Sequence, residues 1–354
     1  MTNLPVATTH LTHIADNWRA LSAIQASAET GAVVKANAYG HGSDAVASAL
    51  AHAGCRSFFV AHVLEGVNLR VALGPEPEIF VFHGFGSGEI PLIREARLIP
   101  VLNTLQQVGQ WREASDSLPA AIHIDTGMNR LGLRPEEAGE ARDQLAECEI
   151  NLVMSHLACA DDPGHDLNRK QLSAFTDLAS LWPGTKRSLA NTAGTYLGAD
   201  YGFELTRPGI GLYGGGPTPP AGTHLKPGLT LTAPALSVFE ALPGETSGYG
   251  ATYTLDTPRT LATVAFGYAD GYPRAAANSG FAMLGEARLP VVGRVSMGLT
   301  TLDITETRDD IEVGSMVEFL GGHAHLEEQA IAAGTLGYEL VTGLGHRVER
   351  IIEN

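Results

Sequence analysis

The chain of 354 residues is too long for one ordinary compact domain and fits one large domain with a smaller one. Hydrophobic residues make up 44% of it and charged residues 18%, which supplies a substantial core and excludes global disorder. A formal net charge of −16 argues against a nucleic-acid partner.

The first part of the sequence alternates short apolar runs with segments of helical periodicity. The runs cover residues 32–35, 57–60, 79–82, 99–102, 121–124, 152–154, 187–189 and 210–213. Between them, segments such as 43–53 and 171–181 place apolar residues at helical spacing. Eight buried strands alternating with helices predict parallel βαβ units and fit a closed (β/α)8 barrel. Periodicity alone leaves a doubly wound open sheet as the alternative.

The pattern changes near residue 213. The stretch 213–228, YGGGPTPPAGTHLKPG, is dense in Gly and Pro and indicates a connection. Strand-like stretches follow at 229–240, 260–266, 287–292, 299–304 and 316–320, and only 326–336 has the spacing of a helix. The sequence thus predicts an α/β barrel over residues 1–223 and a mostly β domain over residues 224–354.

The start of the chain, MTNLPVATTH, lacks the basic residues and apolar run of a signal peptide, and no apolar segment approaches the length of a membrane span. Cys55, Cys148 and Cys159 have no metal or redox spacing, which favours a reducing compartment. We therefore expect a cytoplasmic protein without a membrane partner. The sequence shows no His, Asp or Cys cluster that would predict a bound metal.

Polar residues follow most of the predicted barrel strands, where (β/α)8 enzymes gather their chemistry. They are Lys35, His83, Asp125, Arg130, His156, Asn191, Thr192 and Arg207. Each alone could be an ordinary strand cap. Lys35 is harder to explain in this way, because burial lowers the pKa of a lysine and frees its amine as a nucleophile or base. We expect the strand to run through Lys35 and deliver the amine into the barrel mouth, rather than to turn there.

Such an amine suits a Schiff base with a substrate carbonyl or with pyridoxal phosphate. The phosphate of that cofactor would need hydrogen-bond donors nearby. Backbone N–H groups of Gly209, Ile210 and Gly211 could provide them. The hydroxyl groups of Tyr39 and Thr192 are further candidates.

Six sequence blocks, in order, resemble the alanine racemase family of pyridoxal-phosphate enzymes. They are VVKANAYGHG at 33–42, HIDTGMNRLGL at 123–133, RPGIGLYG at 207–214, SGYGATYT at 247–254, GYADGYPR at 267–274 and GRVSM at 293–297. The resemblance covers nearly the whole chain. It implies a barrel followed by a β domain, a cytoplasmic homodimer, and interconversion of L-alanine with D-alanine, a peptidoglycan precursor.

The resemblance assigns roles to residues in both domains. Lys35 would hold the cofactor covalently and serve as one catalytic base, with Tyr249 as the second base on the opposite face. Cofactor contacts would come from Lys35, Tyr39, Arg130, His156, Asn191, Thr192, Arg207, Gly209 and Ile210, and substrate contacts from Arg130, Tyr268 and Met297. In the family, the tyrosine base and the equivalents of Tyr268 and Met297 belong to the other subunit of the dimer.

These roles agree with the chemistry of racemisation. An α-proton must leave one face of the substrate and return on the other, which two opposed bases do directly. A tyrosine with an ordinary pKa near 10 needs positive neighbours or hydrogen bonds to act as a base near neutrality. Arg207 would face the pyridine nitrogen and keep its proton, so the ring would remain a weaker electron sink and side reactions would be limited.

Ordinary structural roles would also account for several of these residues. Without the resemblance, Tyr249 is an exposed tyrosine in a Gly-rich turn and Arg207 a partner in a structural ion pair. His156 could be a core histidine with satisfied hydrogen bonds, and Met297 could be simple packing.

Three positions depart from the family pattern. His123 stands where many members have a carboxylated lysine that supports the equivalent of Arg130, and histidine forms no stable carbamate. Gly298 follows Met297 where the family usually has aspartate. His346 falls near the position of a further phosphate-contacting tyrosine. These differences bear on rate, pH optimum and substrate breadth.

Other activities remain open on the same scaffold. A serine or broad-specificity amino-acid racemase is the nearest alternative, and related proteins include decarboxylases and a D-threonine aldolase. A non-catalytic pyridoxal-phosphate-binding protein would resemble the barrel alone. Tyr249 and the predicted domain 224–354 argue against that last interpretation.

Overall fold

The computed structural model describes residues 3–114 and 118–354, and it divides the chain into two compact units. The barrel unit comprises Ile14–Leu212 and Gly216–Leu225. The β unit comprises Met1–His13, Tyr213–Gly215 and Lys226–Asn354. Within the described residues, no helix combines the length and apolar character needed to cross a membrane.

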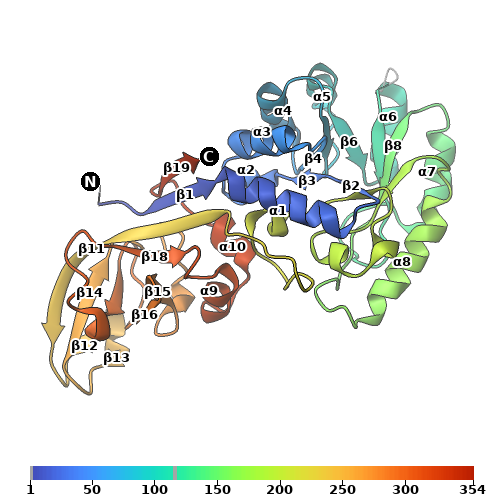
Figure 1. The fold of residues 1–354 in the computed structure, drawn as a ribbon. Helices are drawn as coiled ribbons and strands as arrows, with labels where there is room; N and C mark the ends of the chain where they lie inside the picture. Colours follow the sequence, from blue (N-terminus) through green and yellow to red (C-terminus); the bar gives the residue numbers. More distant parts are fainter. Residues whose placement is uncertain (1–2, 115–117) are drawn as a thin grey trace. The chain divides into compact units, whose positions relative to one another are not determined.

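A seven-stranded parallel sheet forms the centre of the barrel unit (Figure 1). In order it contains β3 (Ala32–Val33), β4 (Ser57–Val60), β5 (Glu78–Val81), β6 (Ile99–Leu102), β7 (Ala120–His123), β8 (Ile150–Met154) and β9 (Lys186–Ser188). Two further strands, β2 (Glu29–Thr30) and β10 (Leu205–Thr206), pair in parallel with each other. All four residues of β4, of β6 and of β7 are buried, as expected for a parallel sheet covered on both faces.

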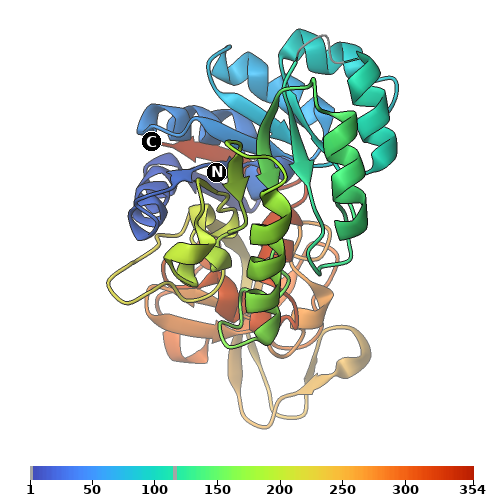
Figure 2. The ribbon, with the colours of Figure 1, turned by 90° about the vertical axis from the view of Figure 1, so that its right-hand side faces the viewer.

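Helices lie along the outer side of these strands, as the blue-to-green part of Figure 2 shows. They are α3 (Ser43–Ala53), α4 (Val63–Leu73), α5 (Ile90–Ala96), α6 (Leu105–Ala114), α7 (Ala138–Gln144) and α8 (Asp166–Ala179), with α1 (Leu11–Ile24) at the start of the chain. This arrangement confirms the predicted class, an α/β barrel followed by a mostly β region. It places the carboxyl ends of the parallel strands at one edge, where the candidate site is found.

The prediction of an eighth barrel strand at residues 210–213 is wrong. Residues Ile210–Tyr213 form the 3-10 helix η4, and the last strand of the barrel unit is β10. The N–H of Leu212 donates to the carbonyl of Gly209, which closes a turn. Gly211 packs against Thr192 so closely that a Cβ would lie 2.6 Å from Thr192 Cγ2. The apolar run is therefore buried as a turn.

The β unit contains a largely antiparallel eight-stranded sheet. Its strands are β1 (Val6–His10), β11 (Leu229–Ala241), β14 (Arg259–Val264), β15 (Phe281–Leu284), β16 (Ala287–Pro290), β17 (Thr300–Asp303), β18 (Met316–Leu320) and β19 (Glu349–Glu353). A separate pair joins β12 (Thr246–Ser247) to β13 (Tyr253–Thr254). The chain's first strand, β1, pairs antiparallel with β11 and parallel with β19.

Two helices, not the single expected one, follow β18. The predicted helix is α9 (Leu326–Ala332), and α10 (Gly337–Thr342) comes directly after it. A Cβ on Gly337 would lie 2.9 Å from Leu326 Cγ, so the start of α10 packs closely on the start of α9. With six residues, α10 is too short to give a clear periodic signal.

Candidate active site

The segment after β3 is a left-handed turn. Strand β3 ends at Val33, and Lys35–Tyr39 form the short element α2. Its residues Ala36, Asn37, Ala38 and Tyr39 all have φ between 52° and 54°. The prediction that the strand runs extended through Lys35 is therefore wrong. Strand β3 ends at Val33, and the backbone that follows Lys35 is left-handed.

Left-handed backbone costs about 1 to 2 kcal/mol per non-glycine residue, so this turn needs support from its surroundings. The N–H of Gly40 donates to the carbonyl of Ala36 at 3.0 Å, and the buried His41 places Nδ1 2.9 Å from the carbonyl of Tyr39. From outside the turn, Glu65 Oε1 accepts the N–H of Ala36 at 2.8 Å. These bonds fix the backbone on which Lys35 and Tyr39 are carried.

The amine of Lys35 has a lowered pKa. Burial of the side chain is the largest cause, and the Arg130 guanidinium adds repulsion, while Glu65 opposes both in part. The Nζ atom lies 5.7 Å from the centre of the Phe82 ring. An amine in this setting reaches its neutral, nucleophilic form more readily than an exposed lysine.

Two hydroxyl groups meet beside the backbone of Gly209. Thr192 Oγ1 accepts the N–H groups of Gly209 at 3.0 Å and of Gly211 at 3.2 Å. A Cβ on Gly209 would lie 2.5 Å from Tyr39 Oη, so only glycine allows this approach. Because Thr192 Oγ1 accepts two bonds, its own proton can be donated outward. The structure brings Tyr39, Thr192 and Gly209 together, while the N–H groups of Gly209 and Gly211, predicted as donors to a phosphate, donate to Thr192.

Arg207 is a deeply buried cation. Its side chain follows β10, is 2% exposed, and donates to the Ser188 hydroxyl and to the backbone carbonyl of Ser155, the latter at 2.6 Å. Burial lowers its pKa to about 9, so it is still charged at neutral pH. Among the described residues it has no carboxylate partner. Its charge therefore adds to a positive field in the barrel mouth.

Arg130 is carried on a loop that Asp125 organises. Asp125 Oδ1 accepts the N–H groups of Gly127, Met128 and Asn129 at 2.8 to 3.1 Å, and Arg134 lies 3.3 Å from Oδ2. Burial alone would raise the pKa of Asp125, but these donors outweigh it and lower the pKa. Asp125 thus holds the loop through Oδ1 and pairs with Arg134 through Oδ2.

Two histidines at the carboxyl ends of the strands have lowered pKa values and are neutral near pH 7. His156, after β8, has a pKa well below its usual value because of burial and of the cations Arg207 and Arg130. His83, after β5, has a pKa lowered by burial, with a contribution from His62, whose ring centre lies 4.6 Å away. Asn191 turns inward on its own segment, where its Oδ1 accepts the N–H of Gly194.

The remaining predicted residues belong to the β unit and are exposed there. Tyr249 is 72% exposed, Met297 59% and Tyr268 45%. The last two lie on paired segments, because the N–H of Tyr268 donates to the carbonyl of Ser296. The turn that carries Tyr249 is backed by Arg294, whose Nη1 would lie 2.9 Å from a Cβ on the neighbouring Gly250.

The three departures from the family pattern have defined surroundings. His123 ends β7 and bonds to Asn103. Gly298 lies against the Arg347 guanidinium, with Nη2 2.7 Å from the position of a Cβ. His346 is exposed in the β unit.

Sequence reasoning missed two residues that support the site. Glu65 stands three residues after His62 at the start of α4, the spacing of a capping box, and this signal was available. Its second role is to accept the N–H of Ala36. The two residues are 29 positions apart in the sequence, and no local pattern predicts this contact. Asn103, next to His123, is the other such residue.

The barrel unit fits pyridoxal phosphate. The lysine has a lowered pKa, and two hydroxyls face a glycine backbone that a Cβ would obstruct. The cations Lys35, Arg130 and Arg207 suit an anionic ligand, and the nearby carboxylates of Glu65 and Asp125 accept backbone N–H groups.

Comparisons with known proteins agree with this chemistry. The family model for the alanine racemase N-terminal domain matches residues 9–217, and the model for the C-terminal domain matches residues 228–352. An alanine racemase of Jannaschia sp. (strain CCS1) is 47% identical over 336 residues, with 95% of each chain covered. A catabolic alanine racemase of Agrobacterium fabrum is 43% identical, with 95% of this chain and 88% of the relative covered.

Solved structures give the same result. The alanine racemase of Bartonella henselae, described with covalently bound pyridoxal phosphate, has a TM-score of 0.94 and 36% identity over 99% of this chain and 100% of that chain. A biosynthetic alanine racemase of Pseudomonas aeruginosa has a TM-score of 0.93 and 35% identity, with both chains covered completely. The chain belongs to the alanine racemase family of pyridoxal-phosphate-dependent isomerases.

Proposed function

We propose that this protein interconverts L-alanine and D-alanine with pyridoxal phosphate, using Lys35 and Tyr249 as bases on opposite faces of the substrate. The observation that carries the proposal is the half-buried Lys35, with its lowered pKa, fixed on a left-handed turn among cations. The cofactor, when bound, supplies the electron sink that acidifies the α-carbon.

The two bases transfer the proton, and the charged residues bind the cofactor and the substrate. Lys35 Nζ holds or returns the α-proton on one face, and Tyr249 Oη does so on the other. Arg130 would contact the cofactor's phenolic oxygen and the substrate. Arg207, charged and buried, would face the pyridine nitrogen and retain its own proton.

Binding roles go to the remaining residues of the candidate site. Tyr39, Thr192, Gly209 and Ile210 surround the phosphate, a role supported by the approach of Tyr39 and Thr192 to the Gly209 backbone. His156 and Asn191 would lie beside the cofactor, and Tyr268 and Met297 would line the substrate side. The exposure of Tyr268 and Met297 in the β unit agrees with this role.

Isotope exchange tests the reaction itself. The enzyme is incubated with L-alanine in deuterated water, and we expect deuterium at the α-carbon together with loss of optical rotation. Release of CO2 or of glycine would contradict the proposal. Preferred turnover of serine would favour the alternative substrate.

The two-base assignment is tested by Tyr249→Phe. We expect the rate from L-alanine to D-alanine to fall about 10² to 10⁴-fold, the range typical of a lost general base. Tyr253→Phe, on the adjacent strand β13, is the matched control and should retain the wild-type rate. Wild-type turnover in Tyr249→Phe would remove Tyr249 from the mechanism.

We further propose a cytoplasmic homodimer that supplies D-alanine for peptidoglycan, in which the partner subunit's Tyr249 completes each site. Mixing inactive Lys35→Ala with inactive Tyr249→Phe tests the sharing. Half of the randomly formed dimers would be hybrids with one intact site, so about a quarter of wild-type activity should return. If both bases came from one chain, the mixture would stay inactive.

A further inference from the structure

The buried amide of Gln171 joins helix α8 to two loops at the carboxyl ends of the barrel strands. The side chain is 0% exposed. Its Nε2 donates to the carbonyl of His156 at 2.9 Å and to Thr126 Oγ1 at 3.2 Å. Its Oε1 accepts the N–H of Ala158 at 2.8 Å. One side chain therefore holds the loop after β7 and the loop after β8 at the same time.

The orientation of this amide is determined by its partners. The N–H of Ala158 can only donate and the carbonyl of His156 can only accept, so a flipped amide would lose both bonds. Breaking any of these bonds would leave a polar group in the interior without a partner, which is costly. The amide of Gln171 thus favours one geometry of the two loops.

The first of these loops carries Arg130. Thr126 stands at its start, directly after Asp125, whose Oδ1 accepts three backbone N–H groups of the same loop. A Cβ on Gly127 would lie 3.6 Å from Gln171 Cγ, so the side chain of Gln171 also packs beside this turn. The loop is therefore held from within by a carboxylate and from α8 by an amide.

Ser155 extends the network to a second cation. Its carbonyl accepts a hydrogen bond from Arg207 Nη2 at 2.6 Å, and its Oγ lies 2.7 Å from Thr126 Oγ1. Ser155 is fully buried and directly precedes His156 in the chain. The network therefore reaches Arg207 and His156 as well as the loop that carries Arg130.

These side chains need support from uncharged groups. Arg207 and Arg130 both disfavour a charge on His156 and lower its pKa. An ion pair would hold the cations in place, but it would also lower the positive potential that an anionic ligand requires. A neutral amide supports their backbone and leaves that potential unchanged.

We propose that Gln171 is a positioning residue of the active site, which ties the loop after β7 to the loop after β8 so that Arg130 and His156 meet the cofactor in one geometry. The inference rests on the proposed function, which gives Arg130 and His156 their contacts with the cofactor. Gln171 is assigned no contact of its own with cofactor or substrate. It acts through the Thr126 hydroxyl and the backbone of the loop after β8.

Gln171→Met tests the role directly, because it keeps the length of the side chain and removes its three hydrogen bonds. We expect kcat/KM for alanine to fall about tenfold, as for a buried group left without its partner. We also expect the visible circular dichroism band of the bound cofactor to weaken, since the groups around the ring are then less firmly held. This second readout does not depend on turnover.

Asn168 provides a matched control on the same helix. It is 1% exposed, and its Nδ2 donates to the carbonyls of Cys159 at 3.1 Å and Asp162 at 2.9 Å, farther along the loop after β8. Asn168→Leu should lower the free energy of unfolding, as Gln171→Met does. It should leave kcat/KM and the cofactor band at their wild-type values.

Thr126 gives a second test that leaves the buried amide in place. Thr126→Val removes the hydroxyl with little change of shape and should lower kcat/KM about threefold. Thr126→Ser keeps the hydroxyl and should restore the wild-type value. Thr126 is half-buried, so both variants are expected to fold even if Gln171→Met does not.

Three results would overturn the inference: a wild-type cofactor band in folded Gln171→Met, an equal loss of that band in Asn168→Leu, or equal kinetics in Thr126→Val and Thr126→Ser. The proposed function fails separately, through an unchanged rate in Tyr249→Phe. The cofactor band reports on the role of Gln171 in either case.

Discussion

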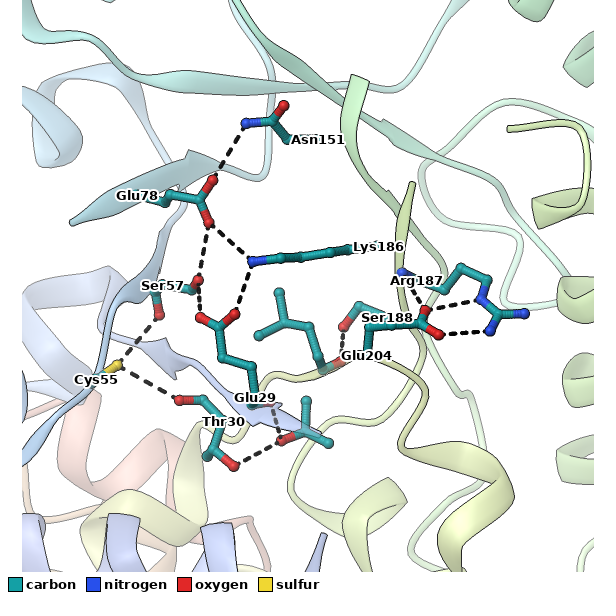
Figure 3. Close-up of polar contacts among 12 residues, drawn as sticks. Glu29, Thr30, Cys55, Ser57, Glu78, Asn151, Lys186, Arg187, Ser188 and Glu204 are labelled. Atoms are coloured by element: carbon teal, nitrogen blue, oxygen red, sulfur yellow. Dashed lines mark hydrogen bonds and ion pairs between the residues drawn. The ribbon is translucent and has the colours of Figure 1, made fainter. Parts of the chain in front are cut away.

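The two ends of the barrel strands handle charge in opposite ways. At the carboxyl ends, Lys35, Arg130 and Arg207 gather without free carboxylates, and the histidines among them have lowered pKa values. At the amino ends, the Lys186 ammonium lies between the carboxylates of Glu29 and Glu78, which outnumber it (Figure 3). The amino ends thus pair their charges in a cluster, while the carboxyl ends carry cations that can receive an anionic ligand.

The cluster at the amino ends joins five strands. Lys186 of β9 lies 2.9 Å from Glu29 of β2 and 3.7 Å from Glu78 of β5. Ser57 of β4 donates to Glu29 at 2.5 Å, and Asn151 of β8 donates to Glu78 at 3.3 Å (Figure 3). Opposed carboxylates with a shared ammonium favour a fixed arrangement of the strand ends. We call the carboxyl ends of the strands the mouth of the barrel and the amino ends its base. The comparison predicts that loss of a cation at the mouth abolishes activity, and that loss of a cation at the base lowers the stability of the fold.

The largest expected effect is that of Lys35→Ala. Removing the covalent attachment point and one base should lower racemase activity by more than about 10³-fold. The fold should be unchanged, since a desolvated lysine among cations contributes little favourable electrostatics. Circular dichroism and urea unfolding check the second point. A large loss of stability would show that the mouth, like the base, depends on its cation for folding.

Much of the barrel could be predicted because its strands are buried on both faces. The runs at 57–60 and 99–102 coincide with β4 and β6, whose residues are all buried. The turn after Val33 could not be predicted, because Ala36, Asn37 and Ala38 adopt left-handed backbone only under the constraint of Glu65 and their neighbours. Local propensity favours the opposite hand.

The next largest effect concerns stability at acid pH. His123 has a pKa of about 4 in the fold, against 6.5 for the free side chain, so the unfolded chain binds more protons between these values. Stability should therefore fall as the pH drops from 6.5 towards 4, by up to about 3 kcal/mol from this group. Urea unfolding of the wild type and of His123→Gln measures the contribution as the difference between their pH slopes. Parallel slopes would contradict it.

Lys186→Ala tests the base of the barrel. Without the ammonium, Glu29 and Glu78 would face each other unneutralised, and we expect a loss of about 1 to 2 kcal/mol, a partly exposed site lying between surface and buried pairs. The rate of racemisation should remain at the wild-type level. The control is Lys170→Ala on α8, an exposed lysine with no ion pair among the described residues. If Lys186→Ala lowered the rate of racemisation without changing the free energy of unfolding, the stabilising role given to the amino ends would be wrong.

The candidate site was only partly visible in the sequence. Lys35 and Thr192 stand at the ends of predicted strands and could be named as candidates from that position, and Gly209 could be named for its backbone N–H beside the run 210–213. Tyr249 could be named only through the resemblance, because an exposed tyrosine in a glycine-rich turn carries no chemical signal of its own. Asn103 was missed because its function lies in two backbone contacts and one imidazole contact, which depend on the tertiary fold.

The smallest expected effect comes from adding a carboxylate where the family usually has one. The guanidinium of Arg347 lies against Gly298, and its Nε is 3.0 Å from the buried Asp270. An aspartate at 298 would offer Arg347 a second anion and would lower the positive potential beside Met297, on the proposed substrate side. We expect Gly298→Asp to change kcat or KM by about two- to threefold, a few tenths of a kcal/mol as for an exposed ion pair, and to leave cofactor binding intact. Gly298→Asn matches the shape without the charge, so a change shared by both variants is steric and a change confined to aspartate is electrostatic. Kinetics equal to wild type in Gly298→Asp would show that the missing carboxylate at position 298 has no influence on the substrate.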